Sequence, residues 1–150
     1  MRPQDAADIV AMARELAAAV DDPEPKLTEA DLMRDGAGPE RWFDCLVAEV
    51  AGHLVAYALV CKGFEAHTAR RRLWLGDFYV RPDARRSGVG RALMTAVARH
   101  AFQLGCDAVY WELWRMNSTG KAFYRSLGAE EAIDLEVMRL DRDRLAALAL

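Results

Sequence analysis

The sequence predicts an α/β protein, or α+β in some classifications, with a mixed, mostly antiparallel sheet that carries helices on both faces. Apolar residues recur at helical spacing in some stretches and as strand-like runs in others, in the order helix, helix, hairpin, strand, helix, strand, helix, strand. The turn at Ala51-Gly52 joins two strand runs directly, which predicts an antiparallel hairpin. A helix separates the runs 73–80 and 108–114, which predicts a parallel pair. Together these connections require a mixed sheet.

Composition places the chain among ordinary globular proteins. Its 150 residues are one domain in length, so we expect one domain over residues 1–150. The 53% hydrophobic and 29% charged residues are typical of a globule. The net charge of −3 and the pI near 5.6 disfavour a general nucleic-acid binder; they suit a cationic substrate, and solubility alone would also explain them.

The sequence also indicates the cellular compartment in which we expect the protein. It has neither the layout of a signal peptide nor a run of about 18 apolar residues, so we expect a cytoplasmic protein without a membrane partner. Cys45, Cys61 and Cys106 are odd in number, lack CxxC spacing and lie in apolar runs. We therefore expect buried, reduced thiols and no metal site.

Two helices are predicted before the hairpin. The first begins at Asp5 and Asp8, which form a possible capping pair, and ends at the proline-containing stretch 21–25. The second is short and begins at Thr28, which can cap it together with Asp31. The inward face of the first helix is expected to carry Ile9, Met12, Ala13, Leu16 and Val20.

Residues 45–50 and 53–62 form the predicted hairpin. The connection 63–72 is polar and holds His67 and three arginines; it is either a solvated loop or a contact for an anionic ligand. The next run, 73–80, is apolar at nearly every residue, as in a strand that is covered on both faces.

The central helix is predicted over 89–104, after the turn at Arg81-Pro82-Asp83, and Gly105 ends it. Its inward face is expected to carry Leu93, Val97, Ala101 and Leu104.

The last third of the chain is predicted to contain a strand over 108–114, a helix within 117–128 and a final strand over 136–140. The tail has a helical pattern, with Asp141 or Asp143 as its cap. We expect this tail to pack on the body or on a second subunit.

A glycine loop lies between the strand 73–80 and the central helix and reads Arg85-Arg86-Ser87-Gly88-Val89-Gly90-Arg91. Gly88 and Gly90 lack a Cβ, so the backbone can approach a ligand, and the N–H groups of the first helical turn have no intrahelical partners. The helix dipole and three arginines favour a phosphate or pyrophosphate. The alternative is a common tight turn, and the third glycine of the dinucleotide fingerprint is absent.

The pattern Arg, two residues, Gly, any residue, Gly over 85–90 resembles the acetyl-coenzyme A loop of the GNAT N-acetyltransferase superfamily. The similarity covers nearly the whole chain and is closest to the diamine (spermidine/spermine) N-acetyltransferase branch. It rests on residues 27–32, 45–50, 77–80, 105–106, 114–117 and 123–129. The family begins with a short strand before an Arg-Pro pair, so we expect that strand to be largely missing before Arg2-Pro3. The resemblance implies a sheet whose central parallel strands splay apart.

In enzymes of this kind the pantetheine arm of the coenzyme lies between the splayed strands, so the resemblance implies acetyl-CoA as the acetyl-donor cosubstrate. Strand backbone would pair with the pantetheine, and the glycine loop would hold the pyrophosphate. The coenzyme-binding residues so implied are Phe78, Tyr79, Val80, Arg85, Arg86, Ser87, Gly88, Val89, Gly90, Arg91, Asn117, Ser118, Thr119 and Gly120. Tyr124 would stand by the thioester sulfur; the alternative is that it belongs to the inner face of its helix.

The chemistry also needs a proton acceptor. An alkyl ammonium with a pKa near 10.4 must lose a proton before its nitrogen attacks, which costs about 4 to 5 kcal/mol at pH 7. Where the diamine enzymes carry Glu-Asp, this chain carries Gly76-Asp77, so the usual base is missing. Asp77 can bind the substrate or act as base, although alternation points it to the face opposite position 76. Glu112 and His67 are further candidates. The acidic and aromatic residues with which the diamine enzymes hold a polyamine have no clear counterparts in this sequence. As substitutes near the first helix only Asp21, Asp22 and Glu24 offer acidity, and a capped helix end or a solvated turn explains them equally well.

We therefore expect an acetyl-CoA-dependent N-acetyltransferase that acetylates a small primary amine of the diamine, polyamine or lysine-analogue type by direct attack in a ternary complex. Because a tyrosine pKa near 10 exceeds a thiol pKa near 8.5, Tyr124 is expected to stabilise the thiolate by a hydrogen bond rather than by full proton transfer. A covalent route through Cys106 is the minor alternative. A non-catalytic coenzyme A-binding module or sensor is the competing class, and a homodimer is expected.

Overall fold

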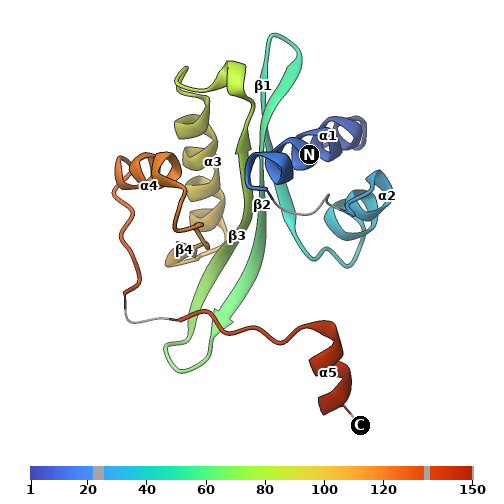
Figure 1. The fold of residues 1–150 in the computed structure, drawn as a ribbon, viewed down its shortest axis with the longest axis vertical. Helices are drawn as coiled ribbons and strands as arrows, with labels where there is room; N and C mark the ends of the chain where they lie inside the picture. Colours follow the sequence, from blue (N-terminus) through green and yellow to red (C-terminus); the bar gives the residue numbers. More distant parts are fainter. Residues whose placement is uncertain (22–25, 134–135, 150) are drawn as a thin grey trace. The chain divides into compact units, whose positions relative to one another are not determined.

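The computed structural model describes residues 1–21, 26–133 and 136–149. The chain forms two compact units, residues 1–112 and residues 113–150 (Figure 1). The first unit contains the sheet, and the described residues of the second form two helices.

The first unit is built on a four-stranded sheet in the order β1-β2-β3-β4. The strands are β1 (Asp44–Val50), β2 (His53–Glu65), β3 (Arg70–Val80) and β4 (Ala108–Tyr110). The pairs β1–β2 and β2–β3 are antiparallel, and β3–β4 is parallel. The predicted mixed, mostly antiparallel sheet is confirmed, with its parallel pair at one end of the described strands.

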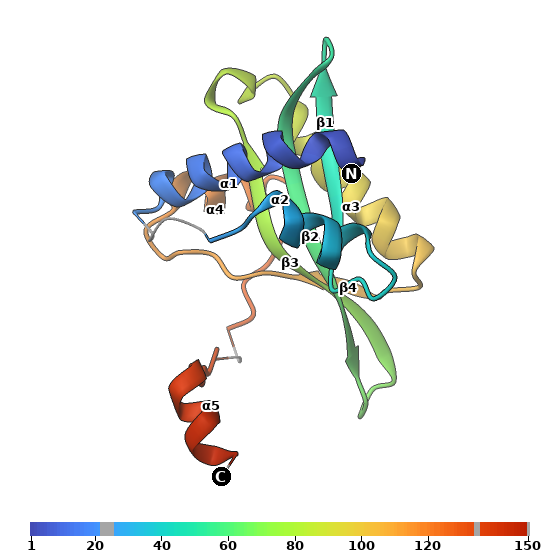
Figure 2. The ribbon, with the colours of Figure 1, turned by 90° about the vertical axis from the view of Figure 1, so that its right-hand side faces the viewer.

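Helices cover both faces of the sheet, as Figure 2 shows. One face carries η1 (Pro3–Asp5), α1 (Ala6–Ala19), α2 (Glu29–Asp31) and η2 (Leu32–Ala37); the other carries α3 (Val89–Gln103), and η3 (Pro82–Ala84) follows β3. The apolar core has two corresponding parts. The α1 side contains Ala6, Ile9, Val10, Met12, Ala13, Leu32, Cys45, Leu54, Tyr57 and Tyr79. The α3 side contains Ala56, Ala58, Val60, Leu73, Leu75, Leu93, Val97 and Ala101.

The two N-terminal helices begin differently. Thr28 caps α2 as predicted, because its hydroxyl accepts a hydrogen bond from the Asp31 N–H (3.2 Å) and the Asp31 carboxylate accepts one from the Thr28 N–H (3.1 Å). Asp5 occupies the predicted N-cap position of α1, but its side chain forms no cap hydrogen bond there. Its buried carboxylate instead accepts hydrogen bonds from the N–H (2.6 Å) and Nε (3.1 Å) of Arg2.

The predicted β1–β2 hairpin forms, and β2 and β3 make a second hairpin that reaches further than predicted. The turn of the first hairpin at Ala51-Gly52 has φ angles of 50° and 82°, which match the right-handed twist of the flanking strands. At the other end, β2 continues to Glu65 and β3 begins at Arg70. The predicted polar connection 63–72 is thus mostly strand, because cross-strand pairing continues and Arg72 forms an ion pair with Glu65.

A β-bulge interrupts β3 at Gly76. Leu75 pairs with Val60 and Asp77 pairs with Leu59, so Gly76 has no partner on β2. Beyond the bulge, Asp77 and Tyr79 lie on the face of the sheet that α1 covers. The prediction that β3 is covered on both faces holds only in part, because Trp74 is 41% exposed and Gly76 is exposed.

The parallel pair is short. Ladder pairing of β3 with β4 runs from Arg72–Ala108 to Trp74–Tyr110 and ends there. The strand predicted over 108–114 therefore stops at Tyr110. The preceding helix α3 closely matches its prediction, with Leu93, Val97 and Ala101 buried.

The second unit contains α4 (Ser118–Arg125) and α5 (Arg142–Leu148). Asp141 caps α5 as predicted, since its carboxylate accepts from the Arg144 N–H (3.1 Å). The strand predicted over 136–140 does not form, and Val137, Met138 and Leu140 are exposed. A strand needs a hydrogen-bonded neighbour, and none of the described residues of this unit lies in a strand. No helix in the described ranges is long and apolar enough to cross a membrane.

Candidate active site

The C-terminal half of β3 has an open edge. One edge pairs with β2 up to Val80, whereas the other pairs with β4 only up to Trp74. Within the described first unit, no strand pairs with the second edge beyond that point. The predicted pantetheine contacts Phe78, Tyr79 and Val80 lie on this segment. A ligand with amide groups can add to such an edge as a strand does.

The glycine loop follows directly, and its backbone has left-handed residues of the kind that backbone anion nests contain. Arg86 (φ 60°) and Gly88 (φ 91°) are left-handed, and Gly88 is the N-cap of α3. A Cβ placed on Gly88 would meet no atom within 4 Å, so the space beside the loop is open. Ser87 Oγ donates to the Ala84 carbonyl (2.7 Å) and holds the turn. The first-turn N–H groups of α3 and the exposed arginines fit a phosphate.

Arg85 turns back towards β3. Its Nε donates to the Val80 carbonyl (2.9 Å), and its guanidinium lies 5.7 Å from the centroid of the Tyr79 ring. Arg85 therefore attaches the loop to the strand. The sequence analysis did not predict this role.

Asp77 lies beside a tyrosine that sequence reasoning missed. Tyr57 Oη donates to Asp77 Oδ2 over 3.0 Å. Burial raises the pKa of Asp77, and the hydrogen bond from Tyr57 opposes that rise. Burial and the nearby Asp77 charge raise the pKa of Tyr57. Tyr57 lies twenty residues before Asp77 in the sequence. Only the register of β2 against β3 would have shown that the two side chains meet.

The bulge corrects the expectation that Asp77 and Gly76 point to opposite faces. Leu75 and Phe78 both belong to the α3 side of the core although they are three residues apart. Strict alternation would separate them, so one extra residue lies between. A Cβ on Gly76 would have its nearest neighbour, the carbonyl oxygen of Leu59, at 3.9 Å. Position 76 therefore has room for a side chain.

The other predicted bases lie elsewhere. His67 is in the hairpin tip, 78% exposed, and six β3 residues separate the base of that tip from Gly76, a span of about 20 Å. This distance excludes His67 as the base beside Gly76. Glu112 is exposed and follows the end of β4 by two residues. Asp21 is exposed after α1, whereas Asp22 and Glu24 lie outside the described residues.

The cysteines are free thiols. Burial raises the pKa of Cys45 to about 12 and also raises that of Cys61, so neither favours the thiolate that a nucleophile requires. Cys106 is half-buried, at the entry to β4. Across the described residues, no group of three or more His, Cys, Asp or Glu side chains could hold a metal ion.

Of the remaining predicted residues, Asn117 to Gly120 lie at the start of α4 in the second unit, and Tyr124 lies near its end. Asn117 Oδ1 accepts from the Gly120 N–H (2.8 Å) and caps the helix. A Cβ on Gly120 would lie 2.7 Å from Asn117 Nδ2, so this glycine permits the cap. Ser118 and Thr119 are exposed on the same turn. Burial raises the pKa of Tyr124 to about 12, and its ring centroid lies 5.1 Å from that of Phe123.

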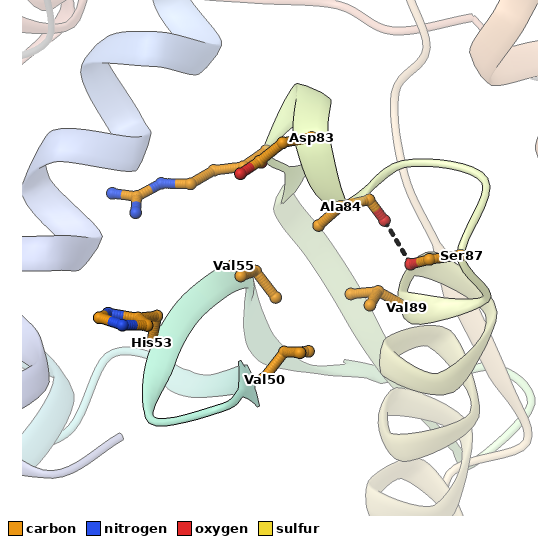
Figure 3. A pocket seen from close by; sticks show the side chains of 8 residues that line it. Val50, His53, Val55, Asp83, Ala84, Ser87 and Val89 are labelled. Carbon is orange, nitrogen blue, oxygen red and sulfur yellow. Dashed lines mark hydrogen bonds between the residues drawn. The ribbon is translucent and has the colours of Figure 1, made fainter.

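A cavity of about 460 Å³ lies between the glycine loop and the β1–β2 turn. Figure 3 shows the side chains of Val50, Val55 and Val89 pointing towards one another across it. Its walls come from the β1–β2 turn and from the chain between β3 and α3, so it lies on the β2 side of β3. It is therefore separate from the open edge, which faces β4.

This fold is that of known acetyltransferases. The chain aligns with an integron cassette protein of V. cholerae (TM-score 0.80, 23% identity, 99% of this chain and 94% of that one). It also aligns with a ribosomal-protein-alanine N-acetyltransferase from Brucella melitensis biovar Abortus 2308 (TM-score 0.74, 22% identity, 93% and 96%). These likenesses define the fold.

The chain belongs to the acetyltransferase (GNAT) family, whose model matches residues 9–129, and it is an acyltransferase. A thialysine N-epsilon-acetyltransferase of Sus scrofa is 31% identical over 88% of this chain and 82% of that protein. The spermidine/spermine N(1)-acetyltransferase-like protein 1 of Homo sapiens is 30% identical over 83% of this chain, but over 19% of its own length. These relatives confirm the resemblance to the diamine branch.

Proposed function

We propose that this protein is an acetyl-CoA-dependent N-acetyltransferase that acetylates a primary amine of a small molecule of the diamine, polyamine or lysine-analogue type. The observation that carries the proposal is the open edge of β3, which leads directly into a glycine loop with two left-handed residues, Arg86 and Gly88. The names of two relatives support this substrate class. The Sus scrofa relative is a thialysine acetyltransferase, and an Arabidopsis thaliana relative, 29% identical over 73% of this chain, is an L-ornithine acetyltransferase.

The two units together form one acetyltransferase domain in this proposal, because the family model runs from residue 9 to residue 129 and so covers parts of both. Phe78, Tyr79 and Val80 offer backbone groups to the pantetheine arm. The loop from Arg85 to Arg91 holds the pyrophosphate. Asn117, Ser118, Thr119 and Gly120 complete the coenzyme site.

Acetyl-CoA supplies an acetyl thioester, and two residues of the chain act on the amine proton and on the leaving thiolate. Asp77 accepts the proton that the amine nitrogen loses as it attacks in the ternary complex. Burial brings the pKa of Asp77 upwards, closer to the working pH, where a general base is most effective.

Tyr124 acts on the leaving group. Its pKa of about 12 exceeds that of a thiol, near 8.5, by about 3.5 units. Complete proton transfer from this phenol to the thiolate is therefore strongly uphill. A neutral Tyr124 hydroxyl instead donates a hydrogen bond to the thiolate.

The protein acts as a cytoplasmic homodimer in this proposal. Free thiols throughout the described chain suit a reducing compartment. Exposed apolar side chains in the tail, including Leu145 and Leu148, suit a contact with a second subunit.

The test is an acetyl-CoA turnover assay that measures free coenzyme A and identifies products by mass spectrometry. The panel contains thialysine, ornithine, spermidine, a short diamine, lysine and an aminoglycoside. Acetylation of at least one small aliphatic amine is expected. If acetyl-CoA binds and no amine is acetylated, the chain is a coenzyme A-binding module and the proposal fails.

A further inference from the structure

Tyr57 and Asp77 form a buried polar pair on the α1 side of the sheet. The Tyr57 side chain has no exposed surface, and its hydroxyl donates to Asp77 Oδ2 over 3.0 Å. In the part of the chain that the structure describes, this is the one hydrogen bond that the Asp77 carboxylate accepts. A carboxylate has lone pairs on both oxygens, so Oδ1 can accept from an incoming donor.

We infer that Tyr57 is a positioning residue for the acceptor amine: it occupies Oδ2 of Asp77, fixes the carboxylate plane and leaves Oδ1 as the oxygen that receives the proton of the amine. This inference rests on the proposed function. As the nitrogen forms the new C–N bond, its N–H bond breaks and the proton passes to Oδ1. The C–S bond breaks at the same carbon and its electron pair leaves on the thiolate.

The surroundings of Tyr57 hold its ring in one place. The ring belongs to the core cluster beneath α1, and Tyr57 pairs across the strands with Tyr79, at a centroid distance of 6.4 Å. The two phenols serve different carboxylates, because Tyr79 Oη donates to Glu15 of α1 over 3.0 Å. Tyr79 is therefore a matched control for Tyr57.

Few other groups near the pair titrate at acidic pH. The ionisable groups around it are Cys45 on β1, Cys61 on β2, Tyr79 on β3 and, on α1, Glu15 and Asp8, which face Arg81. Burial raises the pKa values of both thiols and of both tyrosines, so all four stay neutral below pH 8. A ¹³C resonance assigned to the Asp77 side chain can then distinguish the titration of Asp77 from that of the α1 carboxylates.

The experiment compares the full-length wild type with Tyr57→Phe and Tyr79→Phe. The pKa of Asp77 is measured from its side-chain ¹³C resonance, and the pH dependence of kcat/KM is measured with the best amine of the panel. Tyr57→Phe keeps the ring and removes a hydrogen bond that lowers the pKa of Asp77. We expect that pKa and the acidic limb of the rate profile to rise together by about one pH unit, a tenfold loss of rate at fixed acidic pH. Tyr79→Phe should leave the pKa of Asp77 unchanged.

An unchanged Asp77 titration in Tyr57→Phe would overturn the inference, as would a raised pKa with an unmoved acidic limb. If Tyr57→Phe does not fold, Asp77→Asn tests the pair from its other side. The hydroxyl proton of Tyr57 should then move upfield in the NMR spectrum, because its acceptor loses its charge, and an unmoved resonance would refute the pair. Failure of the proposed function is distinguishable: the wild type would acetylate no amine, while the ¹³C titration would still report the pair.

Discussion

At Gly76 this chain departs from the diamine enzymes that it resembles. This glycine lies in the β3 bulge with space for a side chain, so we expect Gly76→Glu to fold and to place a second carboxylate near Asp77. General-base assistance is typically worth about 10² to 10⁴ in rate. We predict that Gly76→Glu raises kcat/KM by at least about tenfold for amines of high pKa and moves the pH-rate profile to lower pH. Steady-state kinetics with spermidine and a diamine measure both effects.

Two controls separate the charge from the added bulk. Gly76→Gln adds nearly the same volume without a carboxylate, and Gly63→Glu adds the same charge on the distant hairpin arm, where a Cβ would lie 3.7 Å from the Arg72 carbonyl oxygen. Neither should raise the rate. No gain in Gly76→Glu, with folding and acetyl-CoA binding intact, would mean that the whole acceptor site has diverged from the diamine branch.

The buried carboxylate of Asp77 also has a consequence for stability. Its pKa is raised above the ordinary value of 3.8, so the folded state holds its proton more tightly than the unfolded state does. The stability that this proton provides is complete below pH 3.8 and is lost as the pH rises through the folded pKa. Asn does not titrate, and it can still accept from Tyr57.

We therefore predict that the Tm of Asp77→Asn, relative to the wild type, increases between pH 3.5 and pH 7. Thermal unfolding followed by circular dichroism at several pH values tests this. A difference in Tm that stays constant with pH would contradict the assignment of a raised pKa to Asp77.

At the scale of elements, two helix ends offer a controlled test of the anion loop. Gly88 starts α3 with φ 91°, and Gly128 follows α4 with φ 88°; a Cβ at either position meets no atom within 4 Å. A side chain at either position therefore suffers similar backbone strain, about 1 to 2 kcal/mol. Only at Gly88 would it face the proposed phosphate.

We predict that Gly88→Asp lowers acetyl-CoA affinity at least about tenfold, because a carboxylate repels the phosphate and fills its space. Gly128→Asp should lose a similar amount of stability and keep its affinity. Gly90→Asp, within the first turn of α3, should lose affinity without left-handed strain. Calorimetric titration together with thermal melts measures both quantities. Equal affinities in all three variants would refute the loop assignment.

At the scale of the whole molecule, the proposed coenzyme-binding residues belong to both units. A ligand that binds only the folded state stabilises it by about 2.7 kcal/mol at one hundred times Kd. We predict that acetyl-CoA raises the Tm and slows amide hydrogen exchange at 85–91 in the first unit and at 117–120 in the second. Peptide-resolved exchange with and without acetyl-CoA is the measurement. Protection confined to the first unit would remove Asn117 to Gly120 from the site.

Local chemistry was sufficient to predict much of this molecule from its sequence. The capping pair at Thr28, the tight turn at Ala51-Gly52, the helix that begins after Gly88 and the helix capped by Asn117 all depend on neighbours within a few residues. Backbone preferences and apolar periodicity encode such features directly. The prediction that the glycine loop binds an anion is local in the same sense.

Tertiary structure alone decided the features that depend on a distant partner. The bulge at Gly76 exists only relative to β2, and β3 begins as early as Arg70 because residues 70–72 pair with β2. Residues 136–140 have strand-like composition but do not form a strand. Tyr57 meets Asp77 only through strand register. Ladder hydrogen bonds and buried polar contacts join residues that are remote in sequence, so no local pattern specifies them.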